Sequence, residues 1–289
     1  MNDRNSVSKA PKRRRNEIVA FQGEDGAFSH TAALKLRGKG IRTLACPSFR
    51  DVLGKVQTGE ASCGVLPIEN TLHGSVHENY DRLLEYDLFI SGETSIRISH
   101  QLIARPGVEF RDVKRVFSHP VALNQCKRFF ERYPRLEAVP YYDTAGSVKM
   151  LLEHRLSNAA AIASQAASEI YHGRILKRQI EDNRQNFTRF FLLTKQPLAI
   201  SGKGPWKTSL VFSTPNEPAA LFRALACFAL RDLNLTKIES RPLWGKPWEY
   251  LFYVDLQGNE RDEKVQKAIA HLSEMARFIK LLGSYRPTP

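Results

Sequence analysis

The chain has 289 residues, of which 42% are hydrophobic and 25% are charged, as is ordinary for a globular protein. This length is sufficient for two domains, and no apolar run approaches the roughly 20 residues of a membrane span. The formal net charge is +13, but it is spread thinly after residue 16 and no basic, aromatic-rich face accompanies it. That distribution argues against a nucleic-acid-binding fold and suits a small anionic substrate.

Residues 1–16 contain six basic residues and one acidic residue, and we interpret them as a disordered basic tail. Contact of this tail with RNA or an anionic surface is the alternative. The four cysteines lie far apart without paired spacing, which favours a reducing compartment over a disulfide or zinc framework. No charged-then-apolar leader opens the chain. We therefore expect a cytoplasmic protein.

The first 196 residues alternate short apolar strands with amphipathic helices. Strands are expected at 18–21, 43–45, 63–70, 116–120, 139–142, 159–163 and 190–193, and helices at about 29–36, 49–58, 76–86, 121–132, 147–153 and 164–171. An alternating run at 90–103 would carry the chain from one lobe to another, and 175–180 would be a connector. This repeated strand–helix order predicts parallel sheets with helices on their faces.

Polar residues follow five of these strands and would line a cleft between two lobes. The glycine-containing turn at 22–29 could present backbone N–H groups to an anion, although such turns commonly only satisfy a helix end. The polar turn at 185–189 brings together Asn186, Thr188 and Arg189 ahead of a buried strand. The alternative is that Asn186 and Thr188 only cap a turn and Arg189 is a solvated charge.

The pattern changes after a linker at residues 197–206. The expected order is a strand at 208–213, a helix from about 217 to 230, strands at 235–240 and 250–256, a helix at 263–275 and a strand at 278–282. This βαββαβ order is the ferredoxin-like unit. We divide the chain into a tail at 1–16, a two-lobed catalytic domain at 17–196, the linker, and a regulatory domain at 207–285. Removal of 207–289 is expected to leave a competent catalytic domain.

Six segments carry a family resemblance. They are FQG…GAFS at 21–29, LPIEN with GS at 66–75, SHP with QC at 118–126, DTA at 143–145, NFTRF at 186–190 and LTKIESRP at 235–242. In this order they resemble the prephenate dehydratase family, including its arogenate-using relatives, joined to an ACT regulatory domain.

The resemblance implies a periplasmic-binding-protein-like catalytic domain of two α/β lobes and a ferredoxin-like ACT domain. It implies a lyase of L-phenylalanine biosynthesis that converts prephenate to phenylpyruvate by decarboxylative dehydration, or arogenate directly to phenylalanine. It implies L-phenylalanine as allosteric effector, a homodimer or homotetramer, and no metal or organic cofactor. A non-catalytic sensor of an aromatic precursor is the alternative from another class, and the presence of Thr188 disfavours it.

The family pattern gives Thr188 the essential catalytic role. It would give the departing hydroxyl a proton, or a hydrogen bond that strengthens in the transition state. Asn186 would orient Thr188. Arg189 would anchor a substrate carboxylate or make a structural salt bridge, and the sequence leaves both open. The resemblance also places four further residues at or near the site: Glu69, Asn70, Ser118 and Gln125. We expect the pyruvyl end to be held by Asn70, Ser118, Gln125 and Thr144.

The effector would bind near Glu239, Ser240, Arg241 and Pro242, together with the helix start formed by Ala219, Ala220 and Leu221. The family usually has glycine where this chain has Ala219. The added methyl group leads us to expect weaker phenylalanine inhibition, unless it points to solvent.

Overall fold

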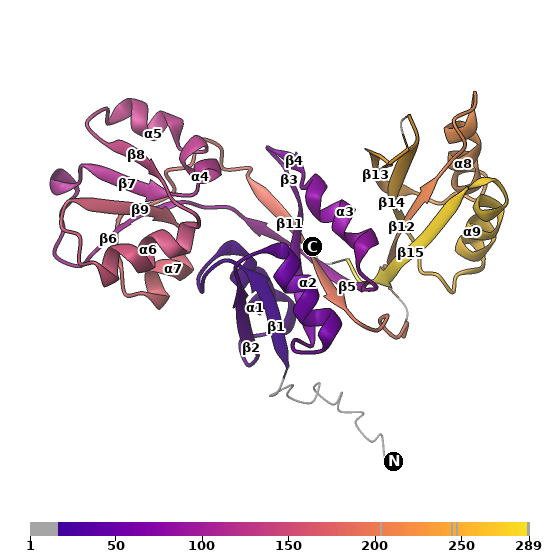
Figure 1. Ribbon diagram of the computed structural model, residues 1–289, viewed down its shortest axis with the longest axis horizontal. Coiled ribbons are helices and arrows are strands. Elements are labelled where there is room, and N and C mark those ends of the chain that lie inside the picture. Colours follow the sequence, from indigo (N-terminus) through magenta and orange to yellow (C-terminus); the bar gives the residue numbers. More distant parts are fainter. Residues whose placement is uncertain (1–16, 203, 244, 247, 288–289) are drawn as a thin grey trace, which may run out of the picture.

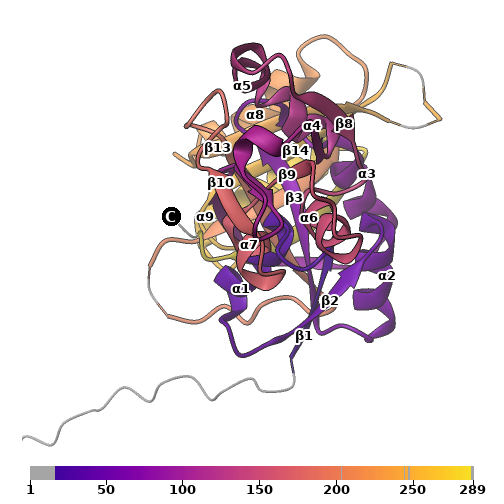
Figure 2. The same ribbon diagram turned by 90° about the vertical axis from the view of Figure 1, so that its left-hand side faces the viewer.

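The computed structural model describes residues 17–202, 204–243, 245–246 and 248–287, so the expected tail at 1–16 lies outside the described residues. Three β-sheets, each with its own helices, lie in a row along the long axis of the molecule (Figure 1). Viewed along that axis, the three units lie one behind another (Figure 2). Among the described residues no helix is long and apolar enough to cross a membrane.

The first lobe, in the middle of the row, has the strand order β2-β1-β3-β11-β5, with β4 paired to β3. Its strands are β1 (Ile18–Gln22), β2 (Arg42–Cys46), β3 (Cys63–Asn70), β4 (Gly74–Ser75), β5 (Phe89–Arg97) and β11 (Phe187–Thr194). Its helices are α1 (Phe28–Arg37), α2 (Phe49–Thr58) and α3 (His77–Glu85).

The second lobe has the strand order β10-β6-β9-β7-β8. Its strands are β6 (Gln101–Ala104), β7 (Arg115–Ser118), β8 (Glu137–Pro140), β9 (Ala159–Ala163) and β10 (Arg174–Lys177). Its helices are η1 (Phe110–Asp112), α4 (Pro120–Asn124), α5 (Lys127–Arg132), α6 (Thr144–Glu153) and α7 (Gln165–Ile170). Asp143 caps α6 as expected, since its Oδ1 accepts from the N–H of Gly146 at 2.7 Å.

The C-terminal unit has the antiparallel order β13-β14-β12-β15. It consists of β12 (Lys207–Ser213), α8 (Ala220–Ala229), β13 (Leu235–Pro242), β14 (Tyr250–Gln257), α9 (Glu263–Met275) and β15 (Phe278–Tyr285). The βαββαβ order predicted from the sequence is confirmed, as is the two-lobed α/β arrangement that precedes it.

The prediction of parallel sheets was wrong in part, because both lobes contain mixed sheets. Strand β11 runs antiparallel to β3 and to β5, and β6 runs antiparallel to β9 and β10. The alternating run at 90–103 is two strands, one in each lobe, and the expected connector at 175–180 begins with β10. The chain passes from the first lobe to the second after β5 and returns before β11. The strands next to these passages pair antiparallel, and the local alternation of strands and helices does not predict this.

Two other local predictions also differ from the structure. The expected helix at 121–132 is broken into α4 and α5. Strand β11 begins at Phe187, so Thr188 and Arg189 lie on a strand and only the residues before them form the turn. On a strand, successive side chains point to opposite faces, and this placement separates Thr188 from Arg189.

The two central strands of the C-terminal sheet, β12 and β14, are buried on both faces. On β12, Leu210 and Phe212 pack with the apolar faces of α8 and α9. Val211, between them, packs in one hydrophobic cluster with first-lobe residues, as do Leu282 and Tyr285. On β14, which was predicted as a strand at 250–256, all residues from 251 to 256 are buried. The C-terminal unit therefore completes the core of the first lobe.

This shared core changes the expected result of removing residues 207–289. Deletion would expose the first-lobe side of the cluster, including Phe191 and Leu193, which are 1% and 0% exposed. A large apolar patch left open to water promotes aggregation. We expect the 1–206 fragment to be insoluble or to unfold at a lower temperature, as measured by a thermal melt. Coexpression with a separate 207–289 chain should restore a soluble complex, and a soluble 1–206 fragment with an unchanged melt would contradict the prediction.

Candidate active site

Thr188, Asn70 and Asn186 form one hydrogen-bonded cluster. The Nδ2 group of Asn70 donates to Oδ1 of Asn186 at 2.7 Å and to Oγ1 of Thr188 at 3.0 Å. The Oδ1 atom of Asn70 accepts from the N–H groups of Leu72 and His73. Both ends of the Asn70 amide are therefore engaged, which fixes its orientation.

The strand register creates this cluster. In the antiparallel pairing of β11 with β3, Thr188 is directly opposite Asn70, and side chains that are directly opposite each other share a face of the sheet. The turn carrying Thr71 docks on the start of β11, where the Thr71 N–H donates to the Phe187 carbonyl at 2.9 Å. Residues more than a hundred positions apart thus meet at one edge of the first lobe.

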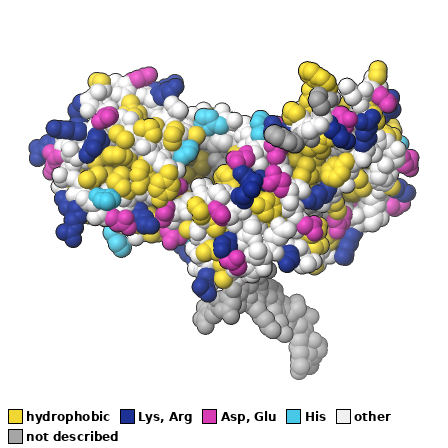
Figure 3. Space-filling model, viewed as in Figure 1, with side chains coloured by type: hydrophobic (Ala, Val, Ile, Leu, Met, Phe, Trp, Pro, Cys, Tyr) yellow, Lys and Arg dark blue, Asp and Glu magenta, His cyan; other side chains and the backbone are white. Residues whose placement is uncertain are grey.

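The cluster retains unused hydrogen-bonding capacity. Oγ1 of Thr188 accepts from Asn70 and donates to none of the described residues, so its proton can be given to a bound group. The Nδ2 group of Asn186 is buried and has no partner within the described structure. An unsatisfied buried donor costs about 1–3 kcal/mol, and such groups are characteristic of sites that a ligand or water completes. The surface is hollowed between the first and second lobes (Figure 3).

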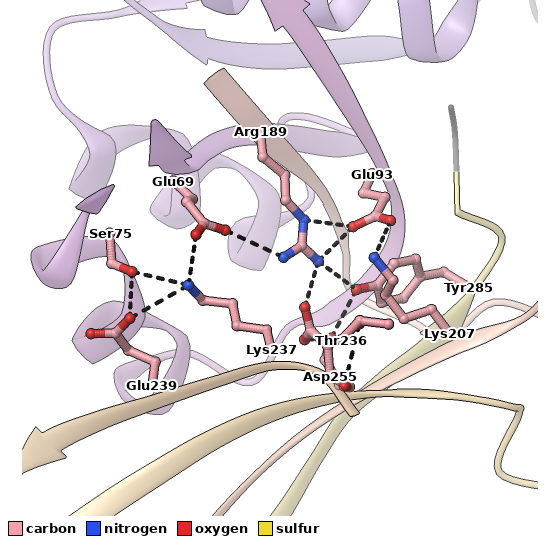
Figure 4. Close-up of polar contacts among 11 residues, drawn as sticks. Glu69, Ser75, Glu93, Arg189, Lys207, Thr236, Lys237, Glu239, Asp255 and Tyr285 are labelled. Carbon is pink, nitrogen blue, oxygen red and sulfur yellow. Dashed lines mark hydrogen bonds and ion pairs between the residues drawn. The ribbon is translucent and has the colours of Figure 1, made fainter. Parts of the chain in front are cut away.

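Glu69 and Arg189 turn away from this cluster toward the C-terminal unit (Figure 4). The Arg189 guanidinium lies 2.5 Å from a Glu93 carboxylate oxygen and 2.6 Å from an Asp255 carboxylate oxygen. Glu69 lies 3.0 Å from Nζ of Lys237. This arrangement favours the structural salt bridge, which the sequence left open for Arg189, over a carboxylate anchor in the cleft.

The surroundings of Arg189 hold it firmly charged. Burial by itself would lower the pKa of Arg189. The charges of Asp255, Tyr285 and Glu93 together raise this pKa by more than burial lowers it, so the net shift is upward. Lys207 adds a second cation, with its Nζ 2.6 Å from Glu93. All four charged side chains are at most 15% exposed. Together with Glu69, Lys237 and Glu239, these four side chains form what we name the interdomain ion cluster: Glu69, Glu93, Arg189, Lys207, Lys237, Glu239 and Asp255.

The second lobe supplies the other expected site residues, and the described hydrogen bonds join none of them to Thr188. Ser118 is fully buried and donates to the Ile162 carbonyl at 2.6 Å. Gln125 lies at the break between α4 and α5, where its Oε1 is 2.8 Å from Nε2 of His100. Thr144 begins α6 and is half-buried. The sequence did not single out His100, although its position in the passage between the lobes was a signal.

The glycine-containing turn after β1 does not present its glycine N–H groups to an anion. The Gly23 N–H donates to the Cys46 carbonyl and that of Gly26 to Nδ1 of His30. The turn instead joins the lobes, because Ser164 donates to the Gly26 carbonyl at 2.6 Å. A Cβ on Gly26 would lie 2.6 Å from Cα of Ala167, so only glycine permits this approach.

The described residues offer neither a three-ligand metal site nor an exposed thiol. No group of three metal-ligating side chains occurs within the described ranges. His77, one of the histidine pair at 73 and 77, lies 3.1 Å from Glu239. All four cysteines are free and buried, and burial raises the pKa of Cys63 to about 11. Such thiols are poor nucleophiles at neutral pH.

Two buried histidines, His30 and His100, and the half-buried His119 make stability sensitive to acid. Burial lowers the pKa values of His30, His100 and His119 below their ordinary value of 6.5. As the pH falls, these histidines bind protons at a higher pH in the unfolded chain than in the folded one. Their contribution to stability is therefore complete above pH 6.5 and is lost as the pH falls below it. We expect the denaturant midpoint to fall between pH 7 and pH 5. The His100→Gln variant should show a shallower decline, and an identical slope in that variant would contradict the role of His100.

A family model for prephenate dehydratase matches residues 19–198, which is more than half of the chain. The chain belongs to the prephenate dehydratase family. It is 43% identical over 277 residues to an arogenate dehydratase/prephenate dehydratase 2 of Arabidopsis thaliana, covering 92% of this chain and 72% of that one. It is therefore a lyase whose reaction is the decarboxylative dehydration of prephenate or arogenate in phenylalanine biosynthesis.

Solved structures agree with this assignment. The prephenate dehydratase of Arthrobacter aurescens, solved in complex with L-Phe, has a TM-score of 0.85 and 33% identity, covering 93% of this chain and 89% of that one. A protein described as a novel type of quorum quenching acylase has a TM-score of 0.86 and 34% identity, covering 94% and 99%. Each of these two structures thus shares the fold over more than nine tenths of this chain.

In this dehydratase, the residues expected to bind the effector lie in two places. Residues 239–242 lie on β13, where Glu239 and Arg241 already contact the first lobe, Arg241 through Asp81 at 2.8 Å. Ala219 is the exposed N-cap of α8, before Ala220 and Leu221. Its backbone has φ 61° and ψ 9°, in the left-handed region. The sequence missed this conformation, which suits the family's glycine.

The strained backbone gives a prediction for Ala219→Gly. A left-handed residue other than glycine costs about 1–2 kcal/mol, and the greater freedom of glycine in the unfolded chain offsets roughly 0.5–1 kcal/mol of the relief. We expect a net gain of about 0.5–1 kcal/mol, measured by urea unfolding. Ala219 is exposed, which agrees with the alternative that its methyl group points to solvent and does not crowd the effector. Superimposable phenylalanine inhibition curves for both proteins would rule out a steric effect on the effector.

Proposed function

We propose that Thr188, held by Asn70, is the group that assists loss of the hydroxyl from prephenate. The observation that carries the proposal is the free Thr188 proton beside the unpartnered Nδ2 group of Asn186. Two donors at one edge of the first lobe suit an oxygen that gains negative charge. Ser118, Gln125 and Thr144 belong to the opposite lobe and would hold the pyruvyl end.

The chemistry needs little more than these donors. As the bond from the ring to its carboxylate breaks, CO2 leaves and the electron pair enters the ring, which becomes aromatic and expels the opposite hydroxyl. That hydroxyl leaves as water after gaining a proton. Threonine is a weak acid, so we propose a hydrogen bond from Thr188 that strengthens in the transition state, with the proton coming finally from solvent.

Substrate preference separates the two forms of the reaction. We expect phenylpyruvate from prephenate, and the alternative is phenylalanine from arogenate, which has an amino group in place of the keto group. Comparing kcat/KM for the two substrates decides between them. Absence of turnover with either substrate, while binding persists, would favour the sensor alternative.

Regulation and assembly are proposed on the same basis. The C-terminal unit would act as an ACT domain that binds L-phenylalanine near residues 239–242 and the start of α8. We also propose a homodimer or homotetramer in the cytoplasm. Light scattering with and without phenylalanine tests the assembly, and loss of RNA retention on deleting residues 1–16 would support a separate function of the tail.

A further inference from the structure

The β3–β4 hairpin, residues 69–75, is held from the C-terminal unit as well as from its own sheet. Strand β13 presents Lys237 and Glu239 to it on one face (Figure 4). Nζ of Lys237 lies 3.0 Å from Glu69 and 3.1 Å from Oγ of Ser75. Ser75 donates to Glu239 at 2.6 Å. Glu69 and Ser75 are paired across the hairpin, so both of its strands are fixed.

These contacts are partly shielded from water. The side chains of Lys237, Glu239 and Glu69 are 10%, 20% and 36% exposed. Burial acts against ionisation of Glu239, but the hydrogen bond from Ser75 and the charge of Lys237 outweigh it and lower its pKa. An ion pair in this setting is screened less by salt than one at the surface.

The hairpin also carries the residue that orients Thr188. Asn70 follows Glu69 directly, and its side chain bonds the N–H groups of the hairpin turn as well as the Thr188 hydroxyl. A displacement of the hairpin would therefore move the donor that holds the catalytic oxygen. Misplacement of a reacting group by about 1 Å can reduce the rate 100-fold.

We propose that Lys237, together with Glu239, is a positioning residue for the dehydratase reaction, acting through the hairpin on Asn70 and Thr188. This inference rests on the proposed role of Thr188. It assigns Glu69 to the same indirect task, rather than to contact with substrate. Lys237 and Glu239 lie on β13, the strand that also carries residues 239–242, which are expected to bind the effector. The regulatory unit would therefore act on the hairpin through this strand.

The Lys237→Met variant tests the proposal by two measurements. Hydrogen exchange of peptides covering residues 69–76 should be faster than in the wild type, and kcat should fall about tenfold with little change in KM. Lys237→Arg should restore both. Lys280→Met is the matched control, because Lys280 also reaches across from the C-terminal unit but bonds the Leu83 and Tyr86 carbonyls at the end of α3. It should leave hairpin exchange and kcat unchanged.

A double variant separates indirect from direct action. If Glu69 acts only through Lys237, adding Glu69→Gln to Lys237→Met should lower kcat no further. A multiplicative loss would assign Glu69 to the substrate and overturn the proposal. Ser75→Ala removes a hairpin contact without unpairing a charge and serves if Lys237→Met does not fold.

The outcomes distinguish this inference from the proposed function. Unchanged hairpin exchange in Lys237→Met or Ser75→Ala overturns the inference whatever the activity. Faster exchange with unchanged kcat overturns the positioning role alone. Full activity of a Thr188→Ala variant would instead overturn the catalytic role of Thr188, and with it the route by which the hairpin influences catalysis.

Discussion

Replacing Thr188 with alanine is expected to lower kcat about 10²–10⁴-fold, the usual contribution of a positioned acid–base group. The variant loses the hydroxyl whose oxygen accepts from Asn70 and whose proton is free. KM should change much less, because the hydrogen bond proposed for Thr188 strengthens only in the transition state. Initial rates of phenylpyruvate or phenylalanine formation measure the loss.

The fold should survive this change. Asn70 retains its bonds to Asn186 and to the Phe187 carbonyl, so the cost to stability is only about 1 kcal/mol. Thr188→Ser should keep much of the activity. Thr194→Ala is the matched control, since Thr194 ends the same strand and its hydroxyl bonds only the Gln196 carbonyl among described partners. Near wild-type kcat in Thr188→Ala would end the catalytic assignment.

Replacing Arg189 with methionine is expected to cost about 3–5 kcal/mol of stability, because it leaves buried carboxylates without their cation. Glu93 and Asp255 are 6% and 7% exposed in their side chains. Asp255 would lose its described cation, whereas Glu93 would keep Lys207 at 2.6 Å.

Urea unfolding at neutral pH measures the Arg189→Met effect. Neutralising the partners as well, with Glu93→Gln and Asp255→Asn, should recover much of the loss. Lys207→Met is the milder comparison, because Glu93 then keeps Arg189. A loss below about 1 kcal/mol together with a strong rise in KM would reverse the interpretation and make Arg189 a substrate anchor after all.

Much of the fold followed from the sequence because it depends on local periodicity. Helix α2 (Phe49–Thr58) and helix α9 (Glu263–Met275) begin and end at the predicted residues. The βαββαβ order and the strand at 159–163 were also predicted correctly. Apolar spacing, caps and turns are properties of neighbouring residues, so a single sequence reveals them.

Chemistry at residues 186–189 was also evident, because an amide, a hydroxyl and a cation stand before a buried strand. The sequence did not show which of them belong together. Thr188 and Arg189 are adjacent, yet one meets Asn70 and the other meets Asp255. Each assignment depends on which segment covers each face of β11.

The sequence by itself thus determined the elements, their order and the residues capable of chemistry. Only the tertiary structure decided the mixed sheets, the burial of β12 and β14 on both faces and the interdomain ion cluster. The hydrogen bond from Asn70 to Thr188 spans 118 positions, and the one from Lys237 to Ser75 spans 162. Such contacts form only when the whole chain has packed, because alternation along a strand gives two faces but not their partners.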